Sequence, residues 1–180
     1  MKKNILIALG VVVVALVIAI STRPVDFKIS RSATIIAQPA VVFGQVNDLH
    51  KWNAWSPWAK LDPNAKNTFE GPAAGTGAIM SWVGNNKVGE GSMTITESRP
   101  SEFIQFKLDF LKPFKATSTA EFTFKAEGSH QTVVTWAMMG HNNFIAKAIS
   151  LFMDCDKMMG GTFERGLAQL KSVAESISKK

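Results

Sequence analysis

The sequence has few of the residue types on which many functional sites depend. It contains one cysteine, Cys155, which excludes an intramolecular disulfide and a multi-cysteine zinc module. It has no tyrosine and only four arginines, which argues against phenol-based chemistry and an arginine-rich grip on nucleic acid. The three histidines, His50, His130 and His141, are far apart and lack metal-ligand spacing. We therefore predict no catalytic residue, no metal, no cofactor and no nucleic-acid partner.

Length and charge limit the remaining possibilities. With 180 residues, 46% hydrophobic and 19% charged, the chain fits one domain with a short appendage, not a polytopic membrane protein or a disordered polyelectrolyte. The formal net charge is +6, and without Lys2 and Lys3 it is +4, from 18 basic and 14 acidic side chains. A weak charge without a basic run identifies no partner.

An unbroken apolar run from Ile5 to Ile20 follows the two lysines. As a helix it would reach about 24 Å, against about 30 Å for the hydrocarbon core of a bilayer. We predict that residues 1–23 form a transmembrane anchor or a signal segment. As an anchor, with membrane contact through residues 5–20, it would hold the domain on the extracytoplasmic side, periplasmic or extracellular, because the lysines favour a cytoplasmic amino terminus. Cleavage after Ser21 would instead give a secreted domain, and a helix buried in a soluble core is the third interpretation.

Residues 24–180 show the patterns of an α+β domain. Apolar residues alternate from Phe27 to Ile35, which predicts a half-buried strand, and Pro39 then opens a helix with an apolar stripe from Val42 to Leu49. Turn signals separate the next runs, as in an antiparallel meander. We expect these five strands at 78–83, 92–97, 102–110, 117–126 and 131–139.

The last forty residues return to a helical period. A short apolar helix is predicted over 144–153, and from Met159 onward apolar residues recur every three or four positions to Ile177. We expect a curved antiparallel sheet wrapped around this long C-terminal helix, with an additional N-terminal apolar helix.

Apolar side chains dominate the predicted inner faces of the strands and of the terminal helix. This interior is either a filled core or an apolar pocket, because a strongly bent sheet around a helix is hard to fill to normal density. Glycines Gly160, Gly161 and Gly166 in the helical stretch fit both views, since they leave room for a ligand or permit close helix–sheet packing. The hypothetical lining consists of Trp82, Phe106, Leu108, Phe122, Phe124, Trp136, Met138, Met159 and Phe163.

The segment with Trp52, Trp55 and Trp58 is the most unusual local feature. These side chains either plug one end of the core, form a rim at the cavity mouth, or lie against a membrane surface. We assign Trp55 and Trp58 to the mouth or surface. We place His141 there too, because it is the one histidine that the strand pattern brings near such a mouth.

The chain resembles the START-like (SRPBCC) superfamily of helix-grip proteins, specifically its polyketide cyclase/dehydrase and lipid-transport family. The resemblance spans Phe27 to Ser176. It rests on Arg31-Ser32-Ala33-Thr34-Ile35, on the stretch from Val46 through Trp52-Asn53-Ala54-Trp55-Ser56-Pro57-Trp58, and on the Glu70–Gly77 segment, Trp82, Val134-Thr135-Trp136 and Phe163-Glu164-Arg165-Gly166-Leu167. It implies a sheet gripping a C-terminal helix around an apolar cavity for lipids, polyketides or other hydrophobic molecules, without implying one activity.

Our leading hypothesis is a membrane-anchored binding domain for a hydrophobic small molecule or lipid, without catalysis. A polyketide cyclase- or dehydratase-like enzyme is the first alternative, with His141 or a strand glutamate as acid or base. The second alternative is a protein-interaction module that uses the tryptophan-rich surface. The sequence does not define the ligand or the oligomeric state.

Overall fold

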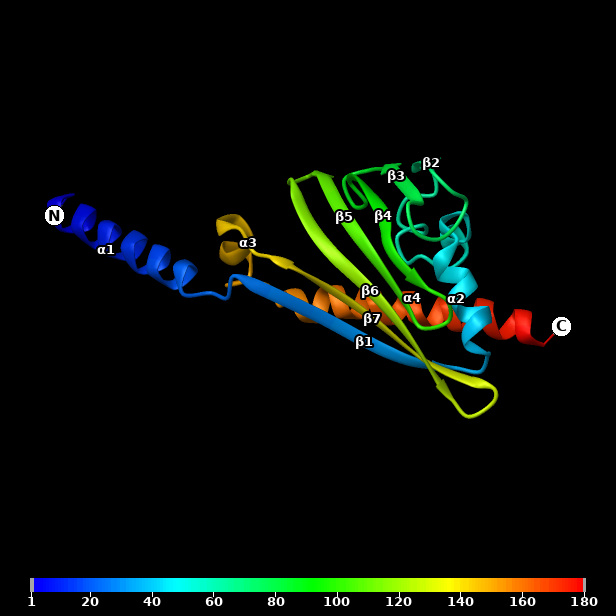
Figure 1. Ribbon diagram of the computed structural model, residues 1–180. Coiled ribbons are helices and arrows are strands. Elements are labelled where there is room, and N and C mark those ends of the chain that lie inside the picture. Colours follow the sequence, from blue (N-terminus) through cyan, green and yellow to red (C-terminus); the bar gives the residue numbers. More distant parts are fainter. Residues whose placement is uncertain (1, 180) are drawn as a thin grey trace.

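The computed structural model describes residues 2–179 and contains one mixed α+β fold (Figure 1). Four α-helices, one 3-10 helix and seven strands follow one another along the described chain. They are α1 (Lys2–Ser21), β1 (Asp26–Ile35), α2 (Pro39–Asn47), η1 (Leu49–Ala54), β2 (Lys66–Glu70), β3 (Ile79–Val83), β4 (Glu90–Arg99), β5 (Phe103–Lys112), β6 (Ala116–Glu127), β7 (Gln131–His141), α3 (Phe144–Ile149) and α4 (Cys155–Ser178).

The seven strands form one antiparallel sheet in the order β1-β7-β6-β5-β4-β3-β2. The strands from β2 to β7 are neighbours in chain order, while β1 pairs with β7 and brings the start of the domain beside its last strand. Figure 1 shows the sheet curving around α4, with α2 crossing near the C-terminal end of that helix. The predicted helix-grip architecture is confirmed.

The strand pattern identified six of the seven strands. It missed β2, whose sequence Lys-Asn-Thr-Phe-Glu lies at the sheet edge and is mostly exposed, so it has no alternation of apolar and polar residues. The long helix α4 starts at Cys155, one turn before the predicted Met159. Asp154 caps the helix by accepting a hydrogen bond from Lys157 N (2.9 Å). The first turn lies before the apolar stripe, so the period of apolar residues does not reveal it.

The tryptophan segment folds back onto the end of α2. Trp52 Nε1 donates to the carbonyl oxygen of Val46 (2.8 Å), and Trp55 Nε1 donates to that of Gln45 (3.0 Å). The last carbonyls of a helix have no partner within it, so the two indoles satisfy groups that would otherwise be buried without a hydrogen bond. This arrangement fixes η1 and the loop after it at one side of the sheet.

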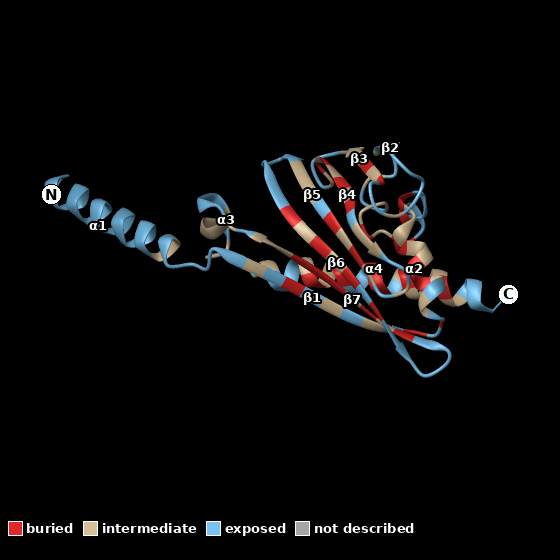
Figure 2. Cartoon of the chain, in the orientation of Figure 1, coloured by how far each residue is buried: buried red, intermediate tan, exposed pale blue. Residues whose placement is uncertain are grey.

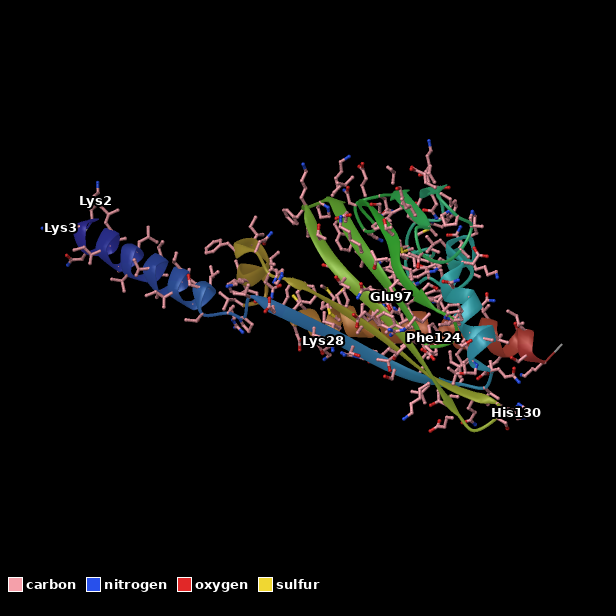
Figure 3. All side chains as sticks on the ribbon, viewed as in Figure 1. Lys2, Lys3, Lys28, Glu97, Phe124 and His130 are labelled. Atoms are coloured by element: carbon pink, nitrogen blue, oxygen red, sulfur yellow. The ribbon has the colours of Figure 1, made fainter. Side chains whose placement is uncertain are left out.

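Helix α1 stands apart from the packed domain, with no buried residue (Figure 2). It is long and apolar enough to cross a membrane. Lys2 and Lys3 lie at its free end, at the opposite end of the molecule from His130 in the β6–β7 turn (Figure 3). The interpretation of this segment as a helix buried in a soluble core is therefore wrong.

Candidate ligand-binding cavity

A cavity of about 390 Å³ lies between the concave face of the sheet and the N-terminal half of α4. The loop over residues 55–65, which joins η1 to β2, covers one side of it. Its volume falls within the range of small-molecule sites, which are concave and mostly apolar. The lining residues are Trp52, Asn53, Ser56, Trp58, Ala59, Asp62, Pro63, Ala65, Asn67, Met80, Trp82, Val88, Met93, Phe106, Leu108, Phe110, Ala120, Trp136, Met138, Met159 and Phe163.

A small residue in the cavity wall stands where its neighbours are large. Ala120 on β6 pairs directly with Phe106 on β5 and with Met138 on β7, and all three line the cavity. Inward side chains of adjacent strands pack against one another in such rows. A methyl group between two long side chains leaves space that neither of them fills.

Aromatic rings form the wall toward α4. The ring of Trp136 stacks on that of Phe163, with centroids 4.3 Å apart and planes 8° apart. Trp58, from the covering loop, meets Trp136 edge-on at 5.7 Å. These ring contacts join the sheet, the helix and the loop into one wall.

A few polar groups gather on the loop side. Asn67 Nδ2 donates to Asn53 Oδ1 (3.1 Å), and Ser56 lies on the same side. The Asp62 carboxylate accepts hydrogen bonds from the backbone N–H groups of Asn64 (3.1 Å) and Asn85 (2.6 Å). The cavity therefore has an apolar body and one polar rim.

Comparison with known proteins matches residues 26–175 to the sequence profile of the family described as polyketide cyclase/dehydrase and lipid transport. The chain belongs to this family. No curated protein matches its sequence significantly. The curved sheet, the long terminal helix and the apolar cavity are consistent with this membership.

Solved structures share the fold of this polyketide cyclase/dehydrase and lipid-transport family member at low sequence identity. A protein of unknown function from Staphylococcus aureus is 12% identical, with a TM-score of 0.63 over 86% of this chain and 97% of the other. The Aha1 dimer from Colwellia psychrerythraea is 16% identical, with a TM-score of 0.59 over 83% and 96%. Ara h 8.0201 is 10% identical, with a TM-score of 0.58 over 84% and 99%. These likenesses concern the fold alone.

Seven of the nine lining residues expected from the sequence of this family member do line the cavity: Trp82, Phe106, Leu108, Trp136, Met138, Met159 and Phe163. Phe122 and Phe124 do not. Phe122 is fully buried and stacks on Trp136 (4.8 Å between centroids), and Phe124 packs against Phe43 of α2 (5.5 Å). Both side chains lie on the inner face of β6, as the lining residue Ala120 does. They lie farther along the strand, where α2 fills the interior.

Of the residues assigned to the mouth or surface, only Trp58 borders the cavity. Trp55 is fully buried, because its ring packs against Phe122 and Trp136 while its N–H binds α2. His141 is exposed at the end of β7 and is hydrogen-bonded to Asp26 at the start of β1, away from the lining residues. Both placements correct the sequence interpretation.

Sequence reasoning missed the part of the lining that comes from the covering loop, and several lining residues on β2, β3 and β4. Met80 and Met93 pair with each other on β3 and β4. Met80 has the same parity as Trp82, so strand alternation carried a usable signal. The loop residues carried none, because an irregular segment has no period that predicts which side chains point inward.

Two of the three glycines in α4 permit close packing. A Cβ on Gly166 would lie 2.8 Å from the Trp136 ring and 3.0 Å from Pro57, and one on Gly160 would overlap the Arg31 guanidinium. At Gly161 the nearest atom would be 3.9 Å away. The close-packing interpretation therefore holds at Gly160 and Gly166, and these residues do not enlarge the cavity.

Arg31, on the inner face of β1, forms the main ionic contact between sheet and helix. Its Nη2 lies 2.9 Å from Asp156 Oδ2, and its Nε lies 2.9 Å from Glu164 Oε1. The hydrogen bond from Arg31 lowers the pKa of Asp156, and the bond to Asp156 raises the pKa of Arg31. None of these groups lines the cavity, so they hold α4 against β1 without contacting a ligand there.

Within residues 2–179, no cluster of three or more histidine, cysteine or acidic side chains is arranged to hold a metal ion. Among the described residues that line the cavity, Asp62 is the one ionisable group. The arrangement can exclude water from an apolar molecule and hydrogen-bond one polar end of it.

Proposed function

We propose that this domain binds a hydrophobic or amphipathic small molecule, such as a lipid, in the cavity under α4. The observation that carries the proposal is the 390 Å³ hollow itself, walled by aromatic, leucine and methionine side chains. Membership of a family described by lipid transport and polyketide chemistry supports the same ligand class.

Desolvation is the driving force in this proposal. Each Å² of apolar surface moved from water into the cavity contributes about 25 cal/mol, before the costs of immobilising the ligand. The methionines Met80, Met93, Met138 and Met159 form an adaptable lining, since their unbranched side chains fit ligands of different outline. The polar rim at Asn53 and Asn67 would orient a ligand with one polar end.

The domain over residues 24–180 is tethered to a membrane by α1 in this proposal. Lys2 and Lys3 at the free end of α1 favour a cytoplasmic amino terminus and an extracytoplasmic domain. Signal cleavage after Ser21 would instead release the domain. The intact mass of the mature protein distinguishes the two, because cleavage removes the entire apolar helix.

An acid–base enzyme is less well supported. Asp62 already accepts two backbone hydrogen bonds, and His141 lies away from the cavity. An interaction module built on tryptophans is also less well supported, since Trp52 and Trp55 are buried.

The test is a cavity-filling substitution in the full-length protein, isolated in nanodiscs from its own membrane. Ala120→Phe places a ring between Phe106 and Met138, and Thr123→Phe places the same ring on the exposed outer face of the same strand. Native mass spectrometry and solvent extraction should find an apolar ligand on the wild type and on Thr123→Phe. Ala120→Phe should carry at least about tenfold less, the equivalent of 1.4 kcal/mol.

Equal ligand content in Ala120→Phe and the wild type would contradict binding in this cavity. Protein that carries no ligand and binds none of a panel of fatty acids and isoprenoids would contradict the proposed ligand class. Turnover of an added polyketide-like substrate would favour the enzyme.

A further inference from the structure

The segment from Asn143 to Asp154, here called the α3 segment, exposes an unusual number of apolar side chains. It joins β7 to α4 and includes α3 itself. Isolated exposed apolar residues are ordinary, but a contiguous group on a domain surface marks an interaction site. The exposed side chains are Phe144 (56%), Ile145 (51%), Ile149 (38%), Phe152 (82%) and Met153 (48%).

The α3 segment lies where α1 leaves the domain. α1 contacts α3, and Figure 1 shows α3 at the end of the sheet nearest to α1. The chain between α1 and β1 is fastened to the residue just before the segment, because Asn142 donates from its backbone N to Val25 O (2.6 Å) and from Nδ2 to Pro24 O (3.3 Å). The apolar group is thus held beside the exit of α1.

The segment is locally ordered although its apolar side chains are exposed. Asn143 Oδ1 accepts a hydrogen bond from Ala146 N (2.8 Å) and caps α3, and Asp154 caps α4 at the other end. The exposed side chains therefore occupy a built surface between two capped helices. Within residues 2–179 these apolar side chains keep between 38% and 82% of their surface exposed.

We propose that the α3 segment lies in the interfacial layer of the membrane that α1 enters, as a second contact that orients the domain. This inference rests on the proposed anchoring by α1. A bilayer that surrounds α1 up to Ser21 has its headgroup layer next to the exit of that helix, where the α3 segment lies. Phenylalanine and isoleucine gain free energy at that depth, and Arg23 and Lys147 can reach the lipid phosphates.

The contact would also place one wall of the cavity near lipid. The α3 segment connects the end of β7 to the start of α4, and each of these elements contributes a methionine to the lining, Met138 and Met159. A domain docked in this way presents the same end to the bilayer in every molecule, whereas a single flexible tether would leave its orientation free.

The test uses the full chain in vesicles of equimolar phosphatidylcholine and phosphatidylglycerol, with single-cysteine variants carrying the environment-sensitive dye NBD. In a Cys155→Ser background, dye is attached at Phe152→Cys or Ile145→Cys. A matched control is Ile36→Cys, which is 55% exposed just after β1, at the end of that strand away from α1. Val12→Cys within α1 reports the anchor.

Doxyl-labelled phosphatidylcholine should quench the dye at positions 145 and 152 at least half as strongly as at position 12, and should leave position 36 unquenched. Quenching at position 12 without quenching at 145 and 152 would overturn this inference and leave the anchor intact. No quenching at position 12 would overturn both. A blue shift at position 152 that grows with protein concentration in detergent, without lipid vesicles, would show that a second copy covers the segment and would overturn the inference.

Discussion

The two halves of α4 face different interiors. Met159 and Phe163 in the first half border the cavity, whereas Leu167, Leu170 and Ala174 in the second half are fully buried in a packed core. One continuous amphipathic stripe therefore serves two purposes. The packed second half, together with the Arg31 ion pairs to the first half, holds the helix on the sheet, which allows the first half to line an open space.

The difference arises from what covers the helix at each end. α2 packs against α4 and contributes the buried Val42, Phe43 and Val46, so the second half has a complete partner. At the cavity the first half faces η1 and the irregular loop over residues 55–65 instead, and a loop supplies fewer side chains per unit length than a helix face. The domain can tolerate a cavity at that end if the packed half supplies most of its free energy of folding.

Truncating one residue in the packed half of the interior and one at the cavity should reveal the largest difference between them. Leu170→Ala removes a fully buried side chain and should lower the free energy of unfolding by about 2–5 kcal/mol. Leu108→Ala should cost less than half as much, because Leu108 borders a space that is already open and its loss creates no new enclosed void. Urea unfolding of the full chain in dodecyl maltoside, followed by near-UV circular dichroism, measures both.

Equal losses would mean that the cavity half is as tightly packed as the other in solution. Loss of all near-UV signal in Leu170→Ala before urea is added would still place that residue in the essential core. The comparison is then carried by the milder Leu170→Val variant, which keeps part of the side chain.

A second comparison uses two glycines only five residues apart on α4. Gly166→Ala gains up to about 1 kcal/mol of helix propensity but drives a methyl group against Trp136 and Pro57, where overpacking costs about 1–3 kcal/mol. We expect a net loss of stability. Gly161→Ala has open space and should raise stability by about 0.4–1 kcal/mol. The same unfolding assay checks both variants. A stabilising Gly166→Ala would show that the Trp136 ring and Pro57 can shift at little cost in free energy.

The sequence was sufficient for most of the fold because the period of apolar residues follows burial. β1 alternates strictly and α4 repeats every three to four residues, so both were visible before the structure. β2 was invisible because an exposed edge strand has no buried face. The end of α3 was also misplaced: after Ile149 the apolar residues continue to Met153, but the helix does not.

The site was less predictable for a related reason. Parity along a strand tells which side chains point inward, and it identified Phe106, Trp136 and Met138. It does not tell how far along the strand the interior is filled. Phe122 and Phe124 were therefore assigned to the cavity, although they lie in the packed half. That boundary depends on where α2 lies over the sheet, a tertiary fact that local pattern does not encode.

The smallest expected effect concerns the ion pairs at the start of α4, in the half that lines the cavity. Because Arg31 lowers the pKa of Asp156 in the folded protein below its ordinary value of 3.8, the folded state favours the ionised carboxylate. This stabilisation is complete above about pH 4, near the pKa of the unfolded chain, and is lost as the pH falls through the lower folded pKa. Asp156→Asn should therefore be less stable than the wild type at pH 6, with a difference that shrinks toward pH 2.

Glu127→Gln, at the exposed last residue of β6, is the matched control and should show no such convergence. Unfolding curves in urea at a series of pH values measure the difference directly. Asp109, whose pKa is lowered by Lys107 and Thr117 on the outer face of the sheet, keeps its own acid dependence in all three proteins, so it cancels in the comparison. A constant gap between Asp156→Asn and the wild type from pH 6 to pH 2 would mean that Asp156 acts through its hydrogen bonds alone. The Arg31 charge would then contribute nothing to holding the cavity half of α4 on β1.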